Sequence, residues 1–346
     1  MSRAQDQAAA TRQDQAGEPG ETRQMNVIEA IRDALIGEME RDERVMMLGL
    51  DIGRLGGVFR ATSGMLERFG RDRVVDTPLA EGAIVGASLG LALSGMRPVA
   101  EIQFLAFGYQ AYHQFAGQLA RFRFRSKGRF STQVTVRAPF GGGVRTPEFH
   151  PDGAEAHFAH VPGLKIVCPM TPYDAKGMLL EAIRDPDPVI YMEPQRLYRR
   201  GRQDVPVEPY TVPFGRARMA RAGDDVTLIA WSGAVELAER AAAELAAEGI
   251  EAGVLDLRTL VPLDVETLVA EVSRTGRAVV VHEAPLTAGF GAEIIATLQE
   301  EAFFSLDAPI ARVTGWDTPY PPASIEDWYL PSLARVVKAA RKVASA

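Results

Sequence analysis

The chain has 346 residues, which is more than one ordinary hydrophobic core needs and predicts two domains. Hydrophobic residues make up 47% and charged residues 24% of the chain, a balance typical of globular proteins. The formal net charge of −7 argues against a nucleic-acid binder, which would need a basic face. No apolar stretch is long enough to span a bilayer, and the single cysteine, Cys168, favours a reducing compartment. We therefore expect a cytoplasmic protein with no nucleic-acid and no membrane partner.

Residues 1–24 are rich in Gln, Ala and charges of both signs, and they lack the apolar segment of a secretory signal. This composition is typical of a disordered tail. The ordered chain is expected to begin near Met25, because Asn26 is a good helix N-cap and Glu29 follows three residues later.

Short apolar runs alternate with helix-period stretches over residues 25–205. Such alternation predicts an α/β domain, in which helices cover both faces of a doubly wound, mainly parallel sheet. The expected strands are Val45–Leu48, Arg73–Asp76, Val99–Phe104, Gln133–Arg137, Lys165–Cys168 and Val189–Met192. The expected helices include Ile84–Leu93, Tyr109–Phe122 and Tyr173–Arg184.

A polar stretch with three prolines at residues 199–213 is predicted to be a linker. The alternation then restarts, so residues 206–346 are predicted to form a second, smaller domain of the same class. Its expected strands are Val226–Trp231, Ala252–Leu257, Ala278–His282 and Ile310–Val313. Its expected helices are Ala234–Ala247, Val265–Ser273, Ala292–Glu301 and Pro331–Val343.

Several familiar motifs are absent, including the P-loop, the dinucleotide fingerprint G-x-G-x-x-G and H-E-x-x-H. Residues 86–90 (GASLG) do match the nucleophile elbow of α/β-hydrolases, with Asp256 and His282 following in the required order. Ser88, however, lies within a run that has glycines at 82, 86 and 90. That spacing puts the glycines on one helical face, so we favour helix packing over catalysis.

The strongest local signal is DTPLAE at residues 76–81, after a predicted strand and before the glycine-rich helix. Open α/β sheets bind their ligands at the carboxyl ends of strands, which is where this segment lies. Spacing alone leaves two interpretations of Glu81: a ligand-binding carboxylate, or a carboxylate that only complements the helix dipole.

DTPLAE belongs to an ordered set of motifs that covers about 320 residues. The set includes GLDIGRLGGVFRATSGMLERFG (49–70), RPVAEIQF (97–104), GQLARFRFRSKGRF (117–130), RAPFGGGVRTPEFH (137–150), PGLKIVCPMTPYDAKG (162–177), AIRDPDPVIYMEP (182–194), DLRTLVPLD (256–264) and RTGRAVVVHEA (274–284). The set resembles the β subunit of thiamine diphosphate-dependent 2-oxo acid dehydrogenases, most closely the pyruvate type of Gram-positive bacteria. The branched-chain type is the alternative, and a non-catalytic docking scaffold of such a complex is a second one.

The resemblance implies a thiamine-binding pyrimidine domain followed by a transketolase-type C-terminal domain. It also implies an α2β2 heterotetramer with thiamine diphosphate between an α and a β chain, acting on a 2-oxo acid and acylating the lipoyl groups of an acyltransferase core. Mg²⁺ bound to the diphosphate needs carboxylate and carbonyl ligands, and the Gly-Asp-Gly that begins the family's magnesium motif is absent here. We therefore expect the α subunit to hold the diphosphate and Mg²⁺.

The resemblance also assigns roles to individual residues. Glu81 corresponds to the glutamate that shares a proton with the aminopyrimidine ring and so promotes loss of the thiazolium proton, a general acid–base role. Leu79, Gln103 and Phe107 correspond to positions that line the pyrimidine pocket. His150 corresponds to a histidine at the mouth of the site, where the acyl group passes to lipoamide. His157 and His160 share a helical face but lack a third ligand, which favours packing.

A potassium ion is the last expectation from the resemblance. In some relatives backbone carbonyls hold this ion, and the corresponding residues here are Val134, Thr135, Ala182, Asp185 and Asp187. The chain departs from the family pattern at two positions: Leu50 replaces a glutamate near the cofactor pocket, and Pro151 follows His150 where relatives carry serine. Both departures are expected to affect the turnover rate or the choice of acceptor more than the fold.

Overall fold

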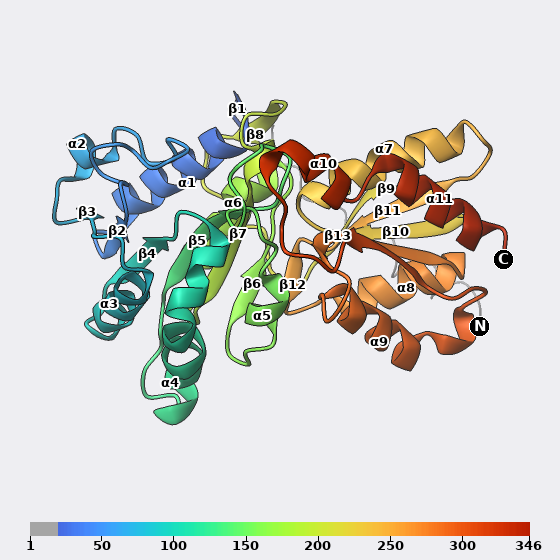
Figure 1. Ribbon diagram of the computed structural model, residues 1–346. Helices are drawn as coiled ribbons and strands as arrows, with labels where there is room; N and C mark the ends of the chain where they lie inside the picture. The colour runs from blue at the N-terminus through green and yellow to red at the C-terminus, as the bar shows by residue number, and fades with distance from the viewer. Residues whose placement is uncertain (1–19) are drawn as a thin grey trace, which may run out of the picture.

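The computed structural model describes residues 20–346, and Figure 1 shows two α/β domains side by side. The larger sheet has seven strands in the order β12-β6-β7-β5-β4-β2-β3. Six of them come from residues 45–194 and run parallel, as the alternation of elements predicts. They are β2 (Val45–Gly49), β3 (Val74–Asp76), β4 (Arg97–Glu101), β5 (Thr135–Phe140), β6 (Lys165–Val167) and β7 (Val189–Pro194).

Side chains of these strands alternate between two cores on opposite faces of the sheet. Tyr191 of β7 joins one core and Met192 the other, which is the period of two that a pleated strand imposes. Helices α1 (Val27–Arg41), α2 (Met65–Phe69) and α6 (Pro172–Arg184) contribute to the first core. The second core takes α3 (Glu81–Leu93), the 3-10 helix η1 (Leu105–Ala111), the π-helix η2 (Gln114–Leu119), α4 (Ala120–Arg125) and α5 (Glu155–Ala159).

The second domain has a five-stranded sheet in the order β14-β13-β10-β11-β9. Its four parallel strands are β10 (Val226–Ala230), β11 (Ala252–Asp256), β13 (Ala278–Pro285) and β14 (Ala311–Gly315), with β9 (Arg218–Arg221) antiparallel at the edge. Its helices are α7 (Gly233–Ala246), α8 (Val265–Thr275), α9 (Gly291–Glu301), the 3-10 helices η4 (Phe303–Ser305) and η5 (Ala323–Ile325), α10 (Glu326–Tyr329) and α11 (Leu333–Ala344).

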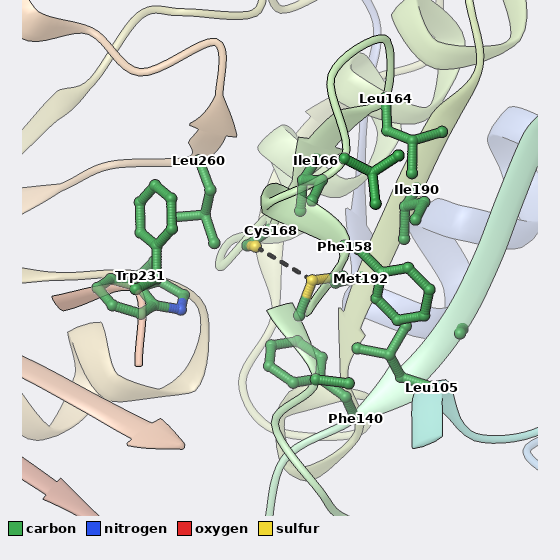
Figure 2. Packing of buried hydrophobic residues seen from close by; sticks show 14 of the residues in the cluster. Leu105, Phe140, Phe158, Leu164, Ile166, Cys168, Ile190, Met192, Trp231 and Leu260 are labelled. Carbon is green, nitrogen blue, oxygen red and sulfur yellow. Dashed lines mark hydrogen bonds between the residues drawn. The ribbon is translucent and has the colours of Figure 1, made fainter. Parts of the chain in front are cut away.

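One hydrophobic core continues from the first domain into the second. Figure 2 shows Cys168 and Met192 of the first domain facing Trp231 and Leu260 of the second, with the two sulfur atoms 3.8 Å apart. Burial raises the pKa of the Cys168 thiol well above its usual value, so this cysteine is an inert packing residue. A shared apolar core of this kind holds the two domains in one fixed arrangement.

The structure differs from the sequence prediction at three places. Thr22, Arg23 and Gln24, predicted as tail, belong to strand β1 (Thr22–Met25), which pairs antiparallel with β8 (Gln203–Pro206) inside the predicted linker. Residues 1–19 of the predicted tail lie outside the described residues. Tyr210, Val212 and Phe214 pack on a core of the first domain, so its packing extends beyond residue 205. Strand β12 (Thr259–Val261), well inside the second half of the chain, pairs with β6 in the first domain's sheet. These pairings join segments far apart in the chain, which local patterns do not reveal.

The single helix predicted at Tyr109–Phe122 is replaced by the succession η1, η2 and α4. Glycine lowers helix stability by about 1 kcal/mol per residue relative to alanine; Gly117 lies within the predicted helix and Gly108 immediately before it. A Cβ at Gly108 would lie 3.2 Å from the ring of Phe158, and one at Gly117 3.0 Å from the ring of His113. Close approach of these rings accounts for the glycines and for the irregular winding.

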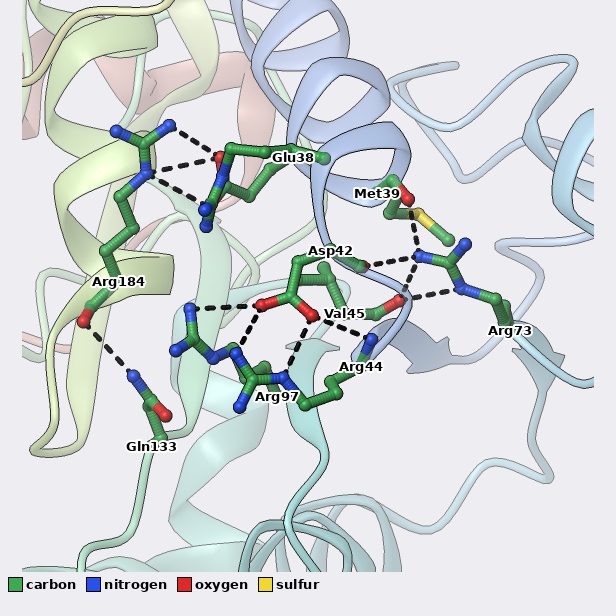
Figure 3. Close-up of polar contacts among 10 residues, drawn as sticks. Glu38, Met39, Asp42, Arg44, Val45, Arg73, Arg97, Gln133 and Arg184 are labelled. Carbon is green, nitrogen blue, oxygen red and sulfur yellow. Dashed lines mark hydrogen bonds and ion pairs between the residues drawn. The ribbon is translucent and has the colours of Figure 1, made fainter.

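At the amino edge of the large sheet, arginine side chains bind backbone carbonyls and a carboxylate of the same chain. Figure 3 shows the Arg73 guanidinium donating to the carbonyls of Met39, Asp42 and Val45. Arg44 and Arg97 meet the Asp42 carboxylate, and hydrogen bonding by Arg44 holds the pKa of Asp42 well below its usual range. This edge is therefore structural. Within residues 20–346, no helix combines the length and apolarity needed to cross a membrane.

Candidate active site

The carboxyl edge of the large sheet has the opposite character, because it carries a buried carboxylate without a partner. Glu81 is the first residue of α3, immediately after the loop that follows β3, and only 5% of it is exposed. Its Oε2 atom is buried, and no hydrogen-bond partner exists for it in the part of the chain that the structure describes. An unmet buried acceptor costs about 1–3 kcal/mol, so the arrangement fits a donor supplied by a ligand.

The start of the DTPLAE segment anchors the neighbouring loop. Asp76 accepts hydrogen bonds from the backbone N–H of Gly53 at 2.6 Å and of Arg54 at 3.1 Å. A Cβ at Gly53 would lie 2.7 Å from the Asp76 carboxylate, so only glycine permits this contact. Asp76 therefore ties the loop after β2 to the loop that presents Glu81.

Strand register brings the predicted pocket residues to one edge. Gly49, the last residue of β2, pairs with Asp76 on one side and with Glu101 on the other, so the chain leaves β3 and β4 next to the same point. Gln103 follows β4 and donates from Nε2 to Asp51 at 3.4 Å. Leu79 follows β3, and 67% of it is exposed. The structure thus places both at the predicted edge, while Leu79 contacts little of this chain.

His150 and Phe107 are brought together, as a common site requires. The His150 imidazole lies edge-on between two phenylalanine rings, with ring centroids 4.6 Å from Phe104 and 5.0 Å from Phe107. Its Nδ1 atom is 3.1 Å from the carbonyl oxygen of Glu148. The ring is partly exposed, so one side remains accessible at the edge of the site.

Two of the other histidines, the buried His282 and the exposed His157, contact aromatic side chains. His282 is fully buried and stacks on Trp231 with centroids 5.0 Å apart, and burial lowers the pKa of its imidazole to about 3. His157 contacts Tyr109, with Nδ1 3.5 Å from the phenol oxygen. Residues 20–346 contain no group of three or more His, Cys, Asp or Glu side chains arranged to hold a metal ion.

The hydrolase-like motif does not form a catalytic triad. The buried Ser88 hydroxyl donates to the Ile84 carbonyl at 2.8 Å, one turn earlier in α3. Asp256 is paired with Arg218 at 3.0 Å, and neither imidazole nitrogen of His282 has a hydrogen-bond partner among the described residues. Ser88 is therefore a helix-packing residue, as the glycine spacing predicts.

The residues of the predicted potassium site are engaged with other groups. The Asp185 carboxylate meets Lys165 Nζ at 2.6 Å, and Asp187 meets Arg123 at 2.7 Å. The carbonyl oxygen of Val134 accepts the N–H of Val189 at 3.0 Å. The Asp185 and Asp187 carboxylates thus form ion pairs with Lys165 and Arg123. The potassium site stays a prediction.

A buried ionic network behind the site was not predicted from the sequence. Arg137 in β5 binds Glu193 through two hydrogen bonds of 2.6 and 2.7 Å and also contacts Glu101. All three side chains are at least 94% buried. Burial raises the pKa of Glu101, whereas the two carboxylates raise that of Arg137. The only signal in the sequence is a charged residue within each apolar strand.

Comparison with known proteins identifies the families to which the two domains are similar. Residues 23–201 match the family described as transketolase, pyrimidine binding domain, and residues 215–336 match transketolase, C-terminal domain. The chain is 50% identical over 320 residues to the pyruvate dehydrogenase E1 component subunit beta of Bacillus subtilis, covering 92% of this chain and 98% of the relative. It is 51% identical over 318 residues to the same subunit of Staphylococcus epidermidis, with coverage of 92% and 98%.

Solved structures show the same fold at low identity. A split-gene transketolase, described as an inactive beta4 tetramer, superposes with a TM-score of 0.76 at 24% identity, covering 93% of this chain and 98% of that one. A transketolase mutant from Pichia stipitis gives 0.67 at 15% identity, covering 94% of this chain and 47% of that one. The two family matches, their order in the chain and the near-complete coverage of the relatives lead to the same result. The chain belongs to the family of pyruvate dehydrogenase E1 component β subunits.

Proposed function

We propose that this chain supplies the half of a pyruvate dehydrogenase active site that activates thiamine diphosphate, and that a separate α subunit completes the site. The observation that supports the proposal best is Glu81, whose buried Oε2 lacks a partner at the carboxyl edge of the sheet. The aminopyrimidine ring of the cofactor offers the nitrogen that such a carboxyl group can hydrogen-bond. The overall reaction is oxidative decarboxylation of the 2-oxo acid, with a lipoyl group as the acyl acceptor.

Each residue of the edge then has a defined task. Thiamine diphosphate, when bound, supplies the electron sink for decarboxylation. Glu81 would hydrogen-bond the pyrimidine nitrogen through Oε2 and hold the shared proton there, and Phe107 with Gln103 would form the side of the pocket that this chain provides. The exposed Leu79 completes the pocket against the α subunit. His150 stands at the mouth and serves the transfer to lipoamide.

The α subunit is proposed to hold the diphosphate and Mg²⁺, because this chain lacks the Gly-Asp-Gly motif. Calorimetry on the isolated chain with thiamine diphosphate and Mg²⁺ is expected to detect no tight binding. Micromolar binding by the isolated chain would contradict the division of the site. A potassium ion at Val134, Thr135, Ala182, Asp185 and Asp187 is proposed separately, and the thermal midpoint of the assembled protein in KCl against NaCl tests it.

The lipoyl acyltransferase core is the proposed second partner, bound through the C-terminal domain. The acidic balance of the chain favours a basic binding region on that partner, so association is expected to slow as salt increases. Truncation near residue 205 is unsuitable as a test, because β12 of the second half completes the first domain's sheet. An association rate independent of salt would argue against charge steering.

The Glu81→Gln variant tests the central proposal. Gln keeps the size and the hydrogen-bonding capacity of the side chain but cannot take up the shared proton. Exchange of the thiazolium proton into D₂O, measured on the assembled protein, is expected to slow on the order of 10²–10⁴-fold, the usual contribution of a general acid–base group.

Glu155 provides a matched control, because it too is a buried glutamate at a helix start with an unpartnered Oε2. Glu155→Gln is expected to exchange at the unmodified rate. If Glu81→Gln assembles with the α subunit and also exchanges at that rate, Glu81 only complements the helix and the proposed role is wrong.

A further inference from the structure

The loop that carries His150 belongs to the first domain by sequence but is fastened by the second domain. Its two ends are joined, since the N–H of Gly141 donates to the carbonyl of Pro151 at 3.1 Å. Between these ends, two carboxylates of the second domain accept backbone N–H groups. Glu283 of β13 accepts from Gly142 at 2.8 Å, and Glu326 at the start of α10 accepts from Arg145 at 3.3 Å.

Both carboxylates are themselves held in place. The second oxygen of Glu283 meets the Arg196 guanidinium at 3.1 Å. Glu326 is 1% exposed, and its Oε1 accepts the Tyr320 hydroxyl at 2.8 Å. Burial and this hydrogen bond raise the pKa of Tyr320, so the phenol stays a donor. The oxygens that meet the loop therefore have fixed positions.

The three glycines of the loop are explained by the same contact. A Cβ at Gly142 would lie 2.1 Å from the Tyr320 hydroxyl oxygen and 2.9 Å from a Leu330 methyl carbon, so the second domain leaves no room for a side chain. Gly141 and Gly143 have φ values of +83° and +93°, which glycine adopts without strain. The GGG sequence thus fits the loop against the segment that contains Tyr320, Glu326 and Leu330.

The imidazole lies between the Arg145 anchor and Pro151, whose carbonyl closes the loop on Gly141. Arg145 and His150 are five positions apart, and only a turn with a hydrogen bond from His150 N–H to the Pro147 carbonyl lies between them. No helix or strand fixes this span. The position of the ring between Phe104 and Phe107 therefore depends on where the loop is anchored.

We propose that Glu283 and Glu326 are positioning residues, which set the His150 imidazole at the mouth of the site by holding the backbone of the loop from the second domain. The inference rests on the proposed role of His150 in transfer to lipoamide. It adds a task for the second domain in the reaction itself, because a displacement of α10 would be passed to His150 through the Arg145 N–H.

The test uses the protein assembled with its α subunit and two activity assays. One measures acylation of a lipoyl domain, and the other measures decarboxylation with an artificial electron acceptor. Glu326→Ala is expected to lower lipoyl acylation on the order of 10- to 100-fold, since small misplacements of a reacting group have effects of this size. Decarboxylation is expected to stay within about twofold, and Glu283→Ala should show the same split.

Two variants separate positioning from a general loss of structure. Glu326→Gln keeps one oxygen for the Arg145 N–H, and its amide NH2 can donate to the Tyr320 oxygen, so it is expected to restore most of the lipoyl acylation. Asp327→Ala removes a neighbouring charge that contacts only the exposed Arg145 side chain, and it should behave as the unmodified protein. Equal loss in both assays, or no rescue by Gln, would overturn the inference.

Amide hydrogen exchange of residues 142–150 gives a readout that does not depend on the chemistry of His150. Glu326→Ala should speed exchange of this segment at least about 10-fold, as expected when a backbone hydrogen bond and its anchor are lost. Unchanged exchange would refute the anchoring. His150→Ala, assayed in parallel, tests the proposed function separately: if it acylates normally, the role of His150 fails and the positioning inference fails with it. If His150→Ala is impaired and Glu326→Ala is not, only the inference is overturned.

Discussion

Glu155 is expected to make the stability of this protein depend on pH near neutrality. Its carboxyl group is 1% exposed, lies at the start of α5 and lines a small cavity between the domains with Trp231, Ser232 and Glu283. Burial raises the pKa of Glu155 from 4.5 to about 7, and the nearby Glu283 carboxylate acts in the same direction. The folded protein therefore keeps this proton at a pH at which an exposed glutamate has lost it.

The sign and size of the effect follow from linkage. A folded pKa above the unfolded value means that the relative stabilisation is fully present below about 4.5 and is lost as the pH rises through about 7. One pKa unit corresponds to about 1.4 kcal/mol, so the free energy of unfolding should fall by about 3 kcal/mol over this interval because of Glu155. Glu155→Gln cannot ionise and should lack this contribution.

Denaturant unfolding of the assembled protein and of Glu155→Gln, measured from pH 5 to pH 8, tests the reasoning. Gln adds an amide that also needs a partner, so a constant offset is expected, but the difference between the two proteins should change with pH. The variant should gain on the unmodified protein by up to about 3 kcal/mol as the pH rises. Glu301→Gln, at an exposed position, is the control and should show no such trend. A difference that stays constant across this range would refute the assignment.

Three further substitutions test other parts of the structure. Gly163→Ala should destabilise the protein by more than about 2 kcal/mol, because φ is +102° and a Cβ would lie 2.1 Å from a backbone oxygen. Gly37→Ala has open space in α1 and should stabilise the protein by about 0.5–1 kcal/mol. Denaturant midpoints of the two variants test both values. Arg137→Met should cost about 3–5 kcal/mol because it leaves two buried carboxylates without a cation. Arg274→Met removes only exposed ion pairs and should cost less than about 1 kcal/mol in the same assay. Ser88→Ala should keep pyruvate-dependent activity, and a loss of activity at unchanged stability would reopen a catalytic role for the hydroxyl.

The sequence by itself determined most of the elements and the edge at which the candidate site lies. Apolar runs such as Val45–Leu48 and Val189–Met192 predict strands because a strand buried on both faces needs consecutive apolar side chains, and both runs form strands of the large sheet. The place of Glu81 follows equally from local order, since a residue between a parallel strand and the next helix lies at the carboxyl edge. The resemblance of the ordered motifs then supplied the family, which no single motif identifies.

Only the tertiary structure decided which distant groups meet. Gly142 and Glu283 are 141 residues apart in the chain, and nothing near either residue indicates the other. Strand β12 joins a sheet formed by the other half of the chain, and Arg137 finds its two carboxylates on neighbouring strands. The physical reason is common to all three cases. Local patterns record which face of an element is buried, whereas the partner of a buried polar group is chosen by the packing of whole elements against one another.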